Sequence, residues 1–207
     1  MSKKQPIQLF VPDTGPLISL ALGNALDLLL LAADDVRIVL TDIVEFEATQ
    51  ASERFQDAKT IREFIAKHAD RIDVIPTTIG RMALSDLVRR REAGEAASLP
   101  KDVGELSITN FVISLRTVNP GEPMLVLIED EWFAANAYSL PGNVHVVSTS
   151  AWLDGLELCG SIPSAAVVRA RIQAARPHFR EDFLVDKEAE KVPSGTEWRS
   201  KFRRGPR

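Results

Sequence analysis

Residues 124–128 read Met-Leu-Val-Leu-Ile, a run of five apolar residues that ends directly at acidic residues. A run with no polar position predicts a strand buried on both faces, as in a parallel sheet that is covered by helices on each side. Shorter apolar runs at residues 7–11, 36–40 and 144–147 predict further buried strands, and residues 71–76 predict a short or edge strand. This one segment therefore already favours an α/β protein.

The segments between these strands have the apolar spacing of helices. Helices are predicted over residues 17–33, 42–51, 58–69, 79–91, 102–116, 132–138, 151–158 and 164–176. Strands that alternate with helices indicate a three-layer α/β/α fold with a central parallel sheet of four to five strands. We expect one such domain over residues 1–165, followed by a C-terminal helix and basic tail over residues 166–207.

The composition limits the classes of function. The 207 residues are 45% hydrophobic and 26% charged, which allows a sizeable core. A single cysteine, Cys159, excludes an intrachain disulfide and a cysteine-based zinc site. No apolar stretch is long enough for a signal peptide or a membrane span, so we expect a cytoplasmic protein with no membrane association.

The charge is unevenly distributed. A net charge of −4 argues against a protein that coats nucleic acid by bulk electrostatics. The C-terminal tail is nevertheless basic, with Arg199, Lys201, Arg203 and Arg204 close together. These side chains are candidates for contact with RNA or an acidic partner, and a solvated terminus or docking onto the body explains them equally well.

Four carboxylates occupy related positions. Asp13 follows the first predicted strand, Glu47 lies on the helix after the second, Glu105 is in the first turn of a helix, and Asp130 comes just after residues 124–128. Because the carboxyl ends of parallel strands meet at one edge of a sheet, we expect these acids to lie near one another. Clustered carboxylates repel each other unless a cation is present, and Mg²⁺ or Mn²⁺ prefers such oxygen ligands. Taken singly, each acid is also explained as a cap or as a partner of a helix dipole.

Several short motifs in the chain resemble those of the PIN-domain family of nucleases, in a bacterial toxin-like branch. They are Phe10-Val-Pro-Asp13-Thr-Gly-Pro-Leu-Ile18, Thr41-Asp-Ile-Val44 with Glu47 after it, Gly104-Glu105, Leu127-Ile-Glu-Asp130 and Val146-Val-Ser-Thr149. The likeness covers about residues 7–165, and the order and spacing of the motifs carry more weight than any one of them.

The resemblance implies metal-dependent hydrolysis of RNA phosphodiesters. It assigns catalysis to Asp13, Glu47, Glu105 and Asp130, with one or two Mg²⁺ or Mn²⁺ ions held by Asp13, Glu105 and Asp130. Glu47 would take part directly or through water. It also implies a homodimer and, because small proteins of this family are often toxins, an antitoxin protein as partner.

The sequence leaves alternatives open at several positions. Glu129 and Glu131 flank Asp130 and compete with it as the ligand, and Glu45 competes with Glu47. The hydroxyls of Thr14 and Ser148 could orient water or phosphate, or cap helices.

Two other functions are compatible with parts of the sequence. Acids on both sides of Asp130 would disfavour close approach of RNA, so a catalytically weak PIN-like module that binds RNA or protein is the alternative function. Asp13-Thr-Gly also spells the aspartic-protease signature, but the helical pattern after it disagrees with an all-β enzyme.

Overall fold

The computed structural model describes residues 8–31, 36–118, 123–129, 140 and 142–176. Its strands are β1 (Leu9–Pro12), β2 (Arg37–Thr41), β3 (Ile72–Ile75), β4 (Met124–Ile128) and β5 (Val144–Ser148). Its helices are α1 (Thr14–Leu22), the 3-10 helix η1 (Leu26–Leu31), α2 (Asp42–Thr49), α3 (Gln56–Lys67), α4 (Thr78–Glu92), α5 (Val103–Val118), α7 (Thr149–Leu158) and α8 (Ala165–Ala175). The helix predicted at residues 132–138 lies outside the described residues.

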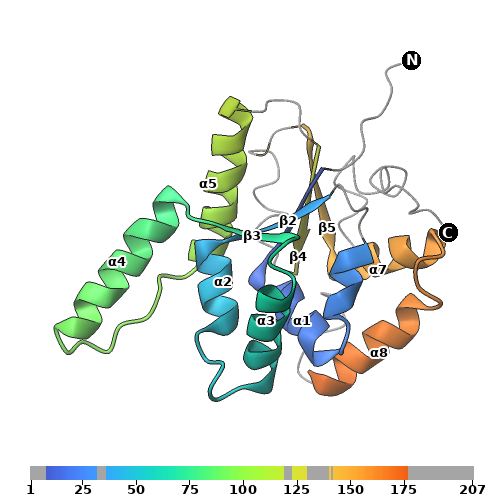
Figure 1. Ribbon diagram of the computed structural model, residues 1–207, viewed down its shortest axis with the longest axis horizontal. Helices are drawn as coiled ribbons and strands as arrows, with labels where there is room; N and C mark the ends of the chain where they lie inside the picture. Colours follow the sequence, from blue (N-terminus) through green and yellow to red (C-terminus); the bar gives the residue numbers. More distant parts are fainter. Residues whose placement is uncertain (1–7, 32–35, 119–122, 130–139, 141, 177–207) are drawn as a thin grey trace.

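The strands form one five-stranded parallel sheet in the order β3-β2-β1-β4-β5 (Figure 1). The chain starts in the middle of the sheet at β1, runs outward to β3, and then returns to β4 on the other side of β1. Because crossovers between parallel strands are right-handed, α1 to α3 cover one face and α5 covers the other. The predicted α/β/α architecture is confirmed. The strand order reverses at β1 and β4, and in open sheets of this kind ligands bind at the carboxyl ends of the strands beside such a reversal.

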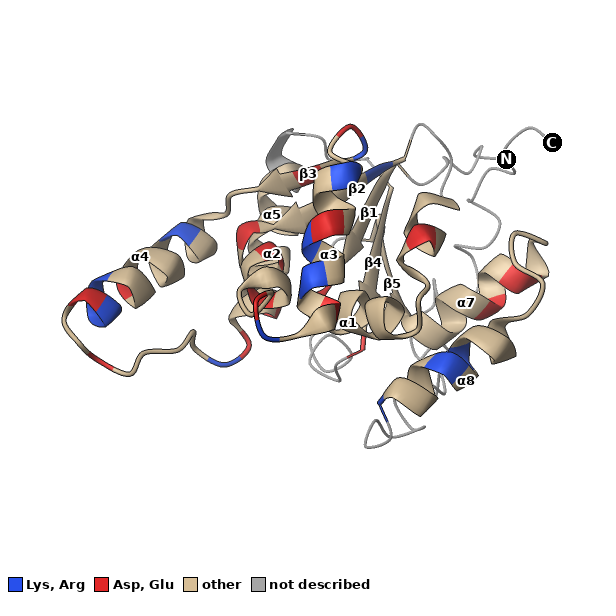
Figure 2. Ribbon diagram, turned by 60° about the horizontal axis from the view of Figure 1, so that its bottom comes forward, with Lys and Arg blue, Asp and Glu red and all other residues tan. Residues whose placement is uncertain are grey.

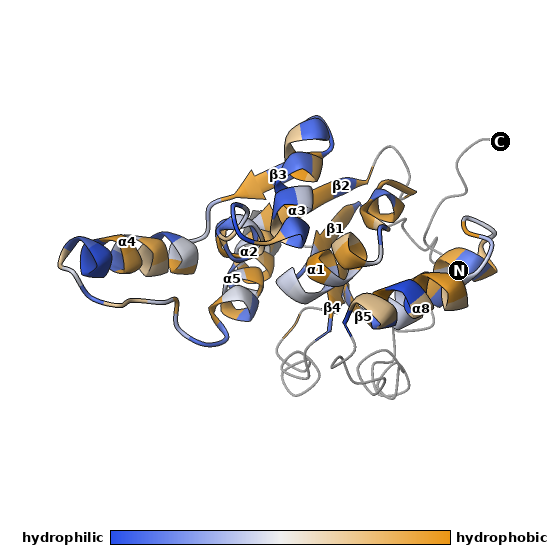
Figure 3. Cartoon of the chain, turned by 90° about the horizontal axis from the view of Figure 1, so that it is seen from below, coloured by the Kyte–Doolittle hydropathy of each residue, from blue (hydrophilic) through white to orange (hydrophobic). Residues whose placement is uncertain are grey.

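The two central strands form the middle of the core. All residues of β1 and β4 are buried, which confirms the prediction that residues 124–128 form a strand covered on both faces. Phe10 on β1 packs against the fully buried Trp152 of α7, with ring centroids 5.6 Å apart. Figure 3 shows the apolar character of the strands in the middle of the fold. β3 is an edge strand and is partly exposed, as predicted for residues 71–76.

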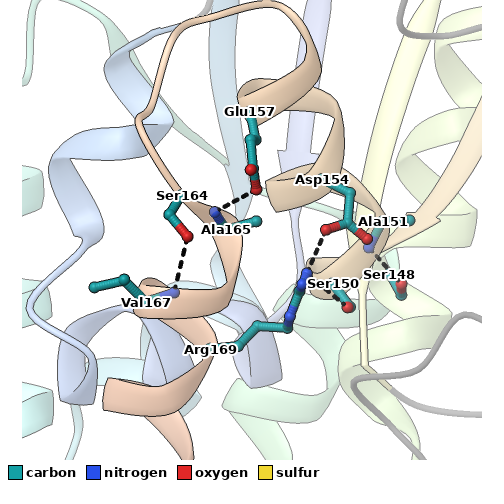
Figure 4. Close-up of polar contacts among 9 residues, drawn as sticks. All are labelled: Ser148, Ser150, Ala151, Asp154, Glu157, Ser164, Ala165, Val167 and Arg169. Atoms are coloured by element: carbon teal, nitrogen blue, oxygen red, sulfur yellow. Dashed lines mark hydrogen bonds and ion pairs between the residues drawn. The ribbon is translucent and has the colours of Figure 1, made fainter.

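Side-chain caps start several helices where the sequence predicted them. Thr41 accepts a hydrogen bond from the backbone N–H of Val44 at the start of α2. Ser148 accepts one from the N–H of Ala151 at the start of α7 (Figure 4). Such caps satisfy N–H groups that have no partner within the helix. They also fix the direction in which each helix leaves the sheet.

The single helix predicted over residues 17–33 is wrong in its extent. α1 begins at Thr14 and ends at Leu22, and η1 is a separate 3-10 helix after it. Asn24 has a φ of 50°, a left-handed conformation that asparagine tolerates and that ends helices. The N–H of Ala25 then bonds back to the carbonyl of Leu20 at 2.8 Å, which closes the helix end. Apolar spacing continues through this break, so periodicity alone could not detect it.

Helices α7 and α8 pack against each other, and α8 also contacts α1 (Figure 1). A Cβ added at Gly23 of α1's C-cap would lie 2.6 Å from Cγ1 of Ile172 on α8, so the two backbones approach closely there. Figure 4 shows the polar contacts of the pair, including Arg169 of α8 with Asp154 and Ser150 of α7. The first part of the predicted C-terminal extension is thus packed on the core.

Helix α4 projects from the body (Figure 1). Its N-cap Thr77 donates a hydrogen bond to Asp42 Oδ1 at 2.9 Å, and a Cβ added at Gly80 would overlap the Asp42 carboxylate. The base of α4 is therefore fixed to the start of α2. Among the described residues, no helix combines the length and the apolar character that crossing a membrane requires.

Candidate active site

Asp13 stands at the carboxyl end of β1, beside β4, where the strand order of the sheet reverses. Its backbone N–H donates to the carbonyl of Leu127 on β4 at 2.9 Å, so the pairing of these strands extends to this residue. Asp13 is the N-cap residue of α1 in extended backbone conformation, but its side chain makes no capping hydrogen bond. The residue is 5% exposed.

Glu47 reaches the same edge from helix α2. Thr14 Oγ1 donates a hydrogen bond to Glu47 Oε2 at 2.9 Å, although the two residues are far apart in the chain. Thr14 is the first residue of α1 and directly follows Asp13. The hydroxyl therefore holds the Glu47 carboxylate beside the start of α1.

Gly104 in the first turn of α5 shows how close the two carboxylates are. A Cβ added there would lie 2.9 Å from Glu47 Oε2 and 3.7 Å from Asp13 Oδ1. Both acids therefore lie within 4 Å of one point on the helix surface. The missing side chain is what allows α5 to begin directly against them, since any larger residue would enter this space.

Buried hydroxyls fix the start of α5 in that place. Ser107 Oγ donates to the carbonyl of Gly104 at 2.6 Å, and Thr41 Oγ1 lies 2.6 Å from the same Ser107 oxygen. Since the Ser107 proton is used on the carbonyl, Thr41 is the donor to Ser107. The cap of α2 and the first turn of α5 are thereby connected, which places both helices at the end of β2.

The electrostatics of the edge are acidic. Helix α2 carries Asp42, Glu45 and Glu47 and no basic residue, and Figure 2 shows its acidic positions. Burial raises the pKa of Glu47 above its ordinary value, and the hydrogen bond from Thr14 opposes that rise. Burial disfavours the charged form of a carboxylate, and a nearby cation would restore it.

Glu105 comes directly after Gly104 in the same turn of α5, so it is close to this edge in the chain. Among the residues that the structure describes, no three His, Cys, Asp or Glu side chains form a group that could hold a metal ion. Asp13, Glu47 and Glu105 therefore do not make such a group by themselves. Asp130, the other predicted ligand, and its neighbour Glu131 lie outside the described residues.

Glu129, an alternative ligand in the sequence, makes a different set of contacts. Its side chain is 5% exposed. It accepts hydrogen bonds from Thr149 Oγ1 at 2.7 Å and from Ser19 Oγ at 2.8 Å, and Arg176 lies 3.4 Å from the carboxylate. Burial raises the pKa of Glu129, while the hydroxyls and the guanidinium of Arg176 oppose the rise.

The contacts of the other residues singled out in the sequence show different roles for them. Ser148 caps α7, which agrees with the capping alternative. Thr49 Oγ1, one turn along the same helix, donates to the Glu45 backbone carbonyl at 2.7 Å and also lies 3.2 Å from Glu45 Oε1. Thr14 makes no cap and instead binds Glu47. The predicted RNA contacts Arg199, Lys201, Arg203 and Arg204 lie outside the described residues.

Ser19 and Arg176 are residues that sequence reasoning missed. Ser19 is the one polar residue in the stretch Leu17-Ile-Ser-Leu-Ala21, and it is fully buried. A lone hydroxyl inside an apolar helix face was the available signal, because buried polar groups need partners. Arg176, at the C-cap of α8, gave no comparable signal.

Comparisons with known proteins give little at the level of sequence: no family model matches the chain, and no curated protein does. Among solved structures, the chain is similar to the crystal structure of VapBC2 from Rickettsia felis bound to a DNA fragment from their promoter. The match has 12% sequence identity, covers 68% of this chain and 98% of that chain, and has a TM-score of 0.40.

The parallel sheet in the order 3-2-1-4-5 with helices on both faces agrees with the architecture that the motifs implied. In this fold, Asp13 and Glu129 come directly after the two strands β1 and β4, where the strand order reverses, and Glu47 lies on the helix after β2.

Proposed function

We propose that this protein is a divalent-metal-dependent ribonuclease that hydrolyses RNA phosphodiesters. The observation that carries the proposal is the meeting of two carboxylates, the buried Asp13 and the half-buried Glu47, within 4 Å of one point beside Gly104. They come from different elements, and they meet at the end of the sheet where its strand order reverses. RNA as the substrate rests on the resemblance of the motifs to the PIN-domain family.

The donor set suits a hard cation. Asp13, Glu47 and Thr14 offer oxygen atoms alone, which Mg²⁺ and Mn²⁺ prefer over nitrogen or sulfur. The pKa of Glu47 is raised because burial disfavours the charged form of its carboxylate. A bound cation would offset that cost. Asp13, Glu105 and Asp130 would hold one or two ions, with Glu47 taking part directly or through water. When bound, such an ion supplies an acidified water molecule and neutralises negative charge on the phosphate.

The side chains of the protein have separate roles in this proposal. Thr14 orients Glu47 through its hydrogen bond, so that the carboxylate does not have to be ordered when substrate binds. Asp13 is fixed through its backbone N–H to β4. As the N-cap of α1, it also lies at the positive end of that helix, which favours the approach of an anionic phosphate.

The cleavage assay uses the full chain with end-labelled single-stranded RNA, in Mn²⁺ or Mg²⁺ and in chelator. Asp13→Asn should reduce cleavage by about 100-fold or more, the equivalent of roughly 2.7 kcal/mol of transition-state stabilisation. Asp154→Asn is the matched control, because Asp154 is also an aspartate but its carboxylate pairs with Arg169 of α8. Glu47→Gln and Glu45→Gln then compare the two acids of α2.

Two results would reject a ribonuclease. One is parent protein that does not cleave RNA in either metal, and the other is Asp13→Asn protein that cleaves as fast as the parent.

A second function, a catalytically weak PIN-like binding module, is favoured by one observation. The described residues by themselves contain no group of three metal-ligating side chains. Binding of labelled RNA that is equal in the parent and in Asp13→Asn, with no cleavage by either, would support the module. The antitoxin partner, the homodimer and the RNA contacts of the basic tail stay predictions that rest on the motif resemblance.

A further inference from the structure

Glu129 directly follows β4, and each of its two carboxylate oxygens accepts a hydrogen bond. Thr149 at the start of α7 donates to Oε1 at 2.7 Å, and Ser19 in α1 donates to Oε2 at 2.8 Å. Both donors are buried hydroxyls. Their protons are committed to this carboxylate, so Glu129 connects two helices with the end of a central strand.

Arg176 brings a third helix into this network. Its Nη1 donates to Ser19 Oγ at 2.6 Å and to Glu129 Oε2 at 3.4 Å. The serine hydroxyl thus accepts from the guanidinium while it donates to the carboxylate. Arg176 is the C-cap residue of α8, and 27% of its side chain is exposed. The end of α8 is in this way tied to the end of β4 and to α1.

The backbone of α1 lies directly on Glu129. A Cβ added at Gly15 would be 3.3 Å from both Cβ and Oε2 of Glu129. Gly15 is two residues after Asp13, in the turn that also carries Thr14, the partner of Glu47. The Glu129 side chain therefore lies directly beside the turn that carries Asp13 and Thr14.

We propose that Glu129 is a positioning residue and not a metal ligand, and that it makes α8 a required part of the metal-binding edge. Its carboxylate, held by Ser19, Thr149 and Arg176, fixes the first turn of α1 against the end of β4. α1 directly follows Asp13, and the end of β4 lies beside β1 where the strand order reverses. This inference rests on the proposed function, since it concerns the metal site of the same enzyme.

The test measures Mn²⁺ affinity from the EPR signal of free Mn²⁺, with the full chain and without RNA. Thr149→Val keeps the shape of the side chain but removes the donor to Glu129, and Thr149→Ser keeps the donor. Arg176→Gln removes the guanidinium. We expect Thr149→Val and Arg176→Gln to weaken Mn²⁺ binding by about 10-fold or more, the usual effect of losing a partner that orients a metal site. Thr149→Ser should bind as the parent does.

Arg169→Gln is the matched control. Arg169 is also on α8, its side chain is also 27% exposed, and it also forms an ion pair, with Asp154 (Figure 4). Its loss should lower the melting temperature in chelator without changing Mn²⁺ affinity. A role of Arg176 in general stability alone would make Arg176→Gln behave in the same way, and that result would overturn the proposal.

Glu129→Gln separates positioning from direct ligation. If Glu129→Gln abolishes Mn²⁺ binding while Thr149→Val and Arg176→Gln bind as the parent does, Glu129 is itself a ligand and the proposal is wrong. If the parent binds Mn²⁺ and cleaves RNA but neither partner variant changes the affinity, this inference alone fails. If the parent does not bind Mn²⁺, the proposed function is wrong, and this inference is then wrong as well because it concerns the same metal site. Arg176→Lys keeps the charge and replaces Arg176→Gln if the latter does not fold.

Discussion

Replacing Gly104 with alanine should separate stability from function, because a single methyl group would enter the space between two carboxylates. The new Cβ would lie 2.9 Å from Glu47 Oε2 and 3.7 Å from Asp13 Oδ1. Non-bonded contacts are favourable at about 3.5–4.0 Å, so the Glu47 oxygen must move by roughly half an ångström or more. Asp13 is already at an ordinary contact distance.

The cost to folding should be small. Moving Glu47 lengthens its 2.9 Å hydrogen bond from Thr14, and losing such a bond costs about 1 kcal/mol. Alanine in place of glycine in a helix gains up to about 1 kcal/mol, and Gly104 lies within α5. The two effects nearly cancel. For a chain of this size we expect a melting temperature within about 4 °C of the parent.

The effect on metal binding should be large by comparison. Once the Glu47 carboxylate is displaced, it no longer lies beside Asp13 in the arrangement that would hold the ion. We therefore expect Mn²⁺ affinity and RNA cleavage to fall by about 10- to 100-fold. Titration of free Mn²⁺ by EPR and thermal unfolding in chelator measure the two quantities on one preparation. Ser114→Ala is the control, because Ser114 is an exposed position on the same helix.

Two outcomes would contradict this reasoning. Gly104→Ala protein that binds Mn²⁺ and cleaves RNA as the parent does would show that Asp13 and Glu47 share no functional pocket at this point. A loss of more than about 3 kcal/mol of stability would show instead that Glu47 cannot move, since overpacking a site that can adjust costs less than that.

The other predictions concern pH and the base of α4. Burial raises the pKa of Glu47, so this group favours folding most below its ordinary value of 4.5, and that contribution is lost as pH rises through the raised pKa. Glu47→Gln does not titrate. In chelator, its free energy of unfolding relative to the parent should therefore rise between about pH 4 and pH 7 in denaturant titrations, and a constant difference would refute this. Gly80→Ala would place a methyl on the Asp42 carboxylate and displace its bond from Thr77. It should cost about 1–3 kcal/mol, and an unchanged denaturation midpoint would contradict it.

The sequence predicted the sheet well because its signals are local. A fully apolar run such as residues 124–128 has one stable environment, a strand with both faces covered, and β4 has it. Thr41 and Ser148 were predictable as caps for the same reason, since a capping hydroxyl acts within its own turn. Asp13 and Glu47 could be singled out because the residues after each strand of a parallel sheet gather at one edge.

Other features were outside the reach of local signals. The break between α1 and η1 depends on the left-handed backbone of Asn24, which an asparagine permits but does not require. The sequence also ranked Glu129 among the ligand candidates from its place beside Asp130. Its burial and its three partners emerged from the structure, because Ser19 and Arg176 are 157 residues apart and meet through the packing of α8 on α1.

The amino-acid sequence by itself determined that this chain forms a parallel α/β sheet with acids at its carboxyl edge, because strand burial and helix capping are decided by neighbours a few residues apart. Tertiary structure decided how those acids are used. Gly104 admits α5 against Asp13 and Glu47, while Glu129 is enclosed by hydroxyls and a guanidinium. Such differences depend on which helices pack together, and packing is a property of the folded chain as a whole.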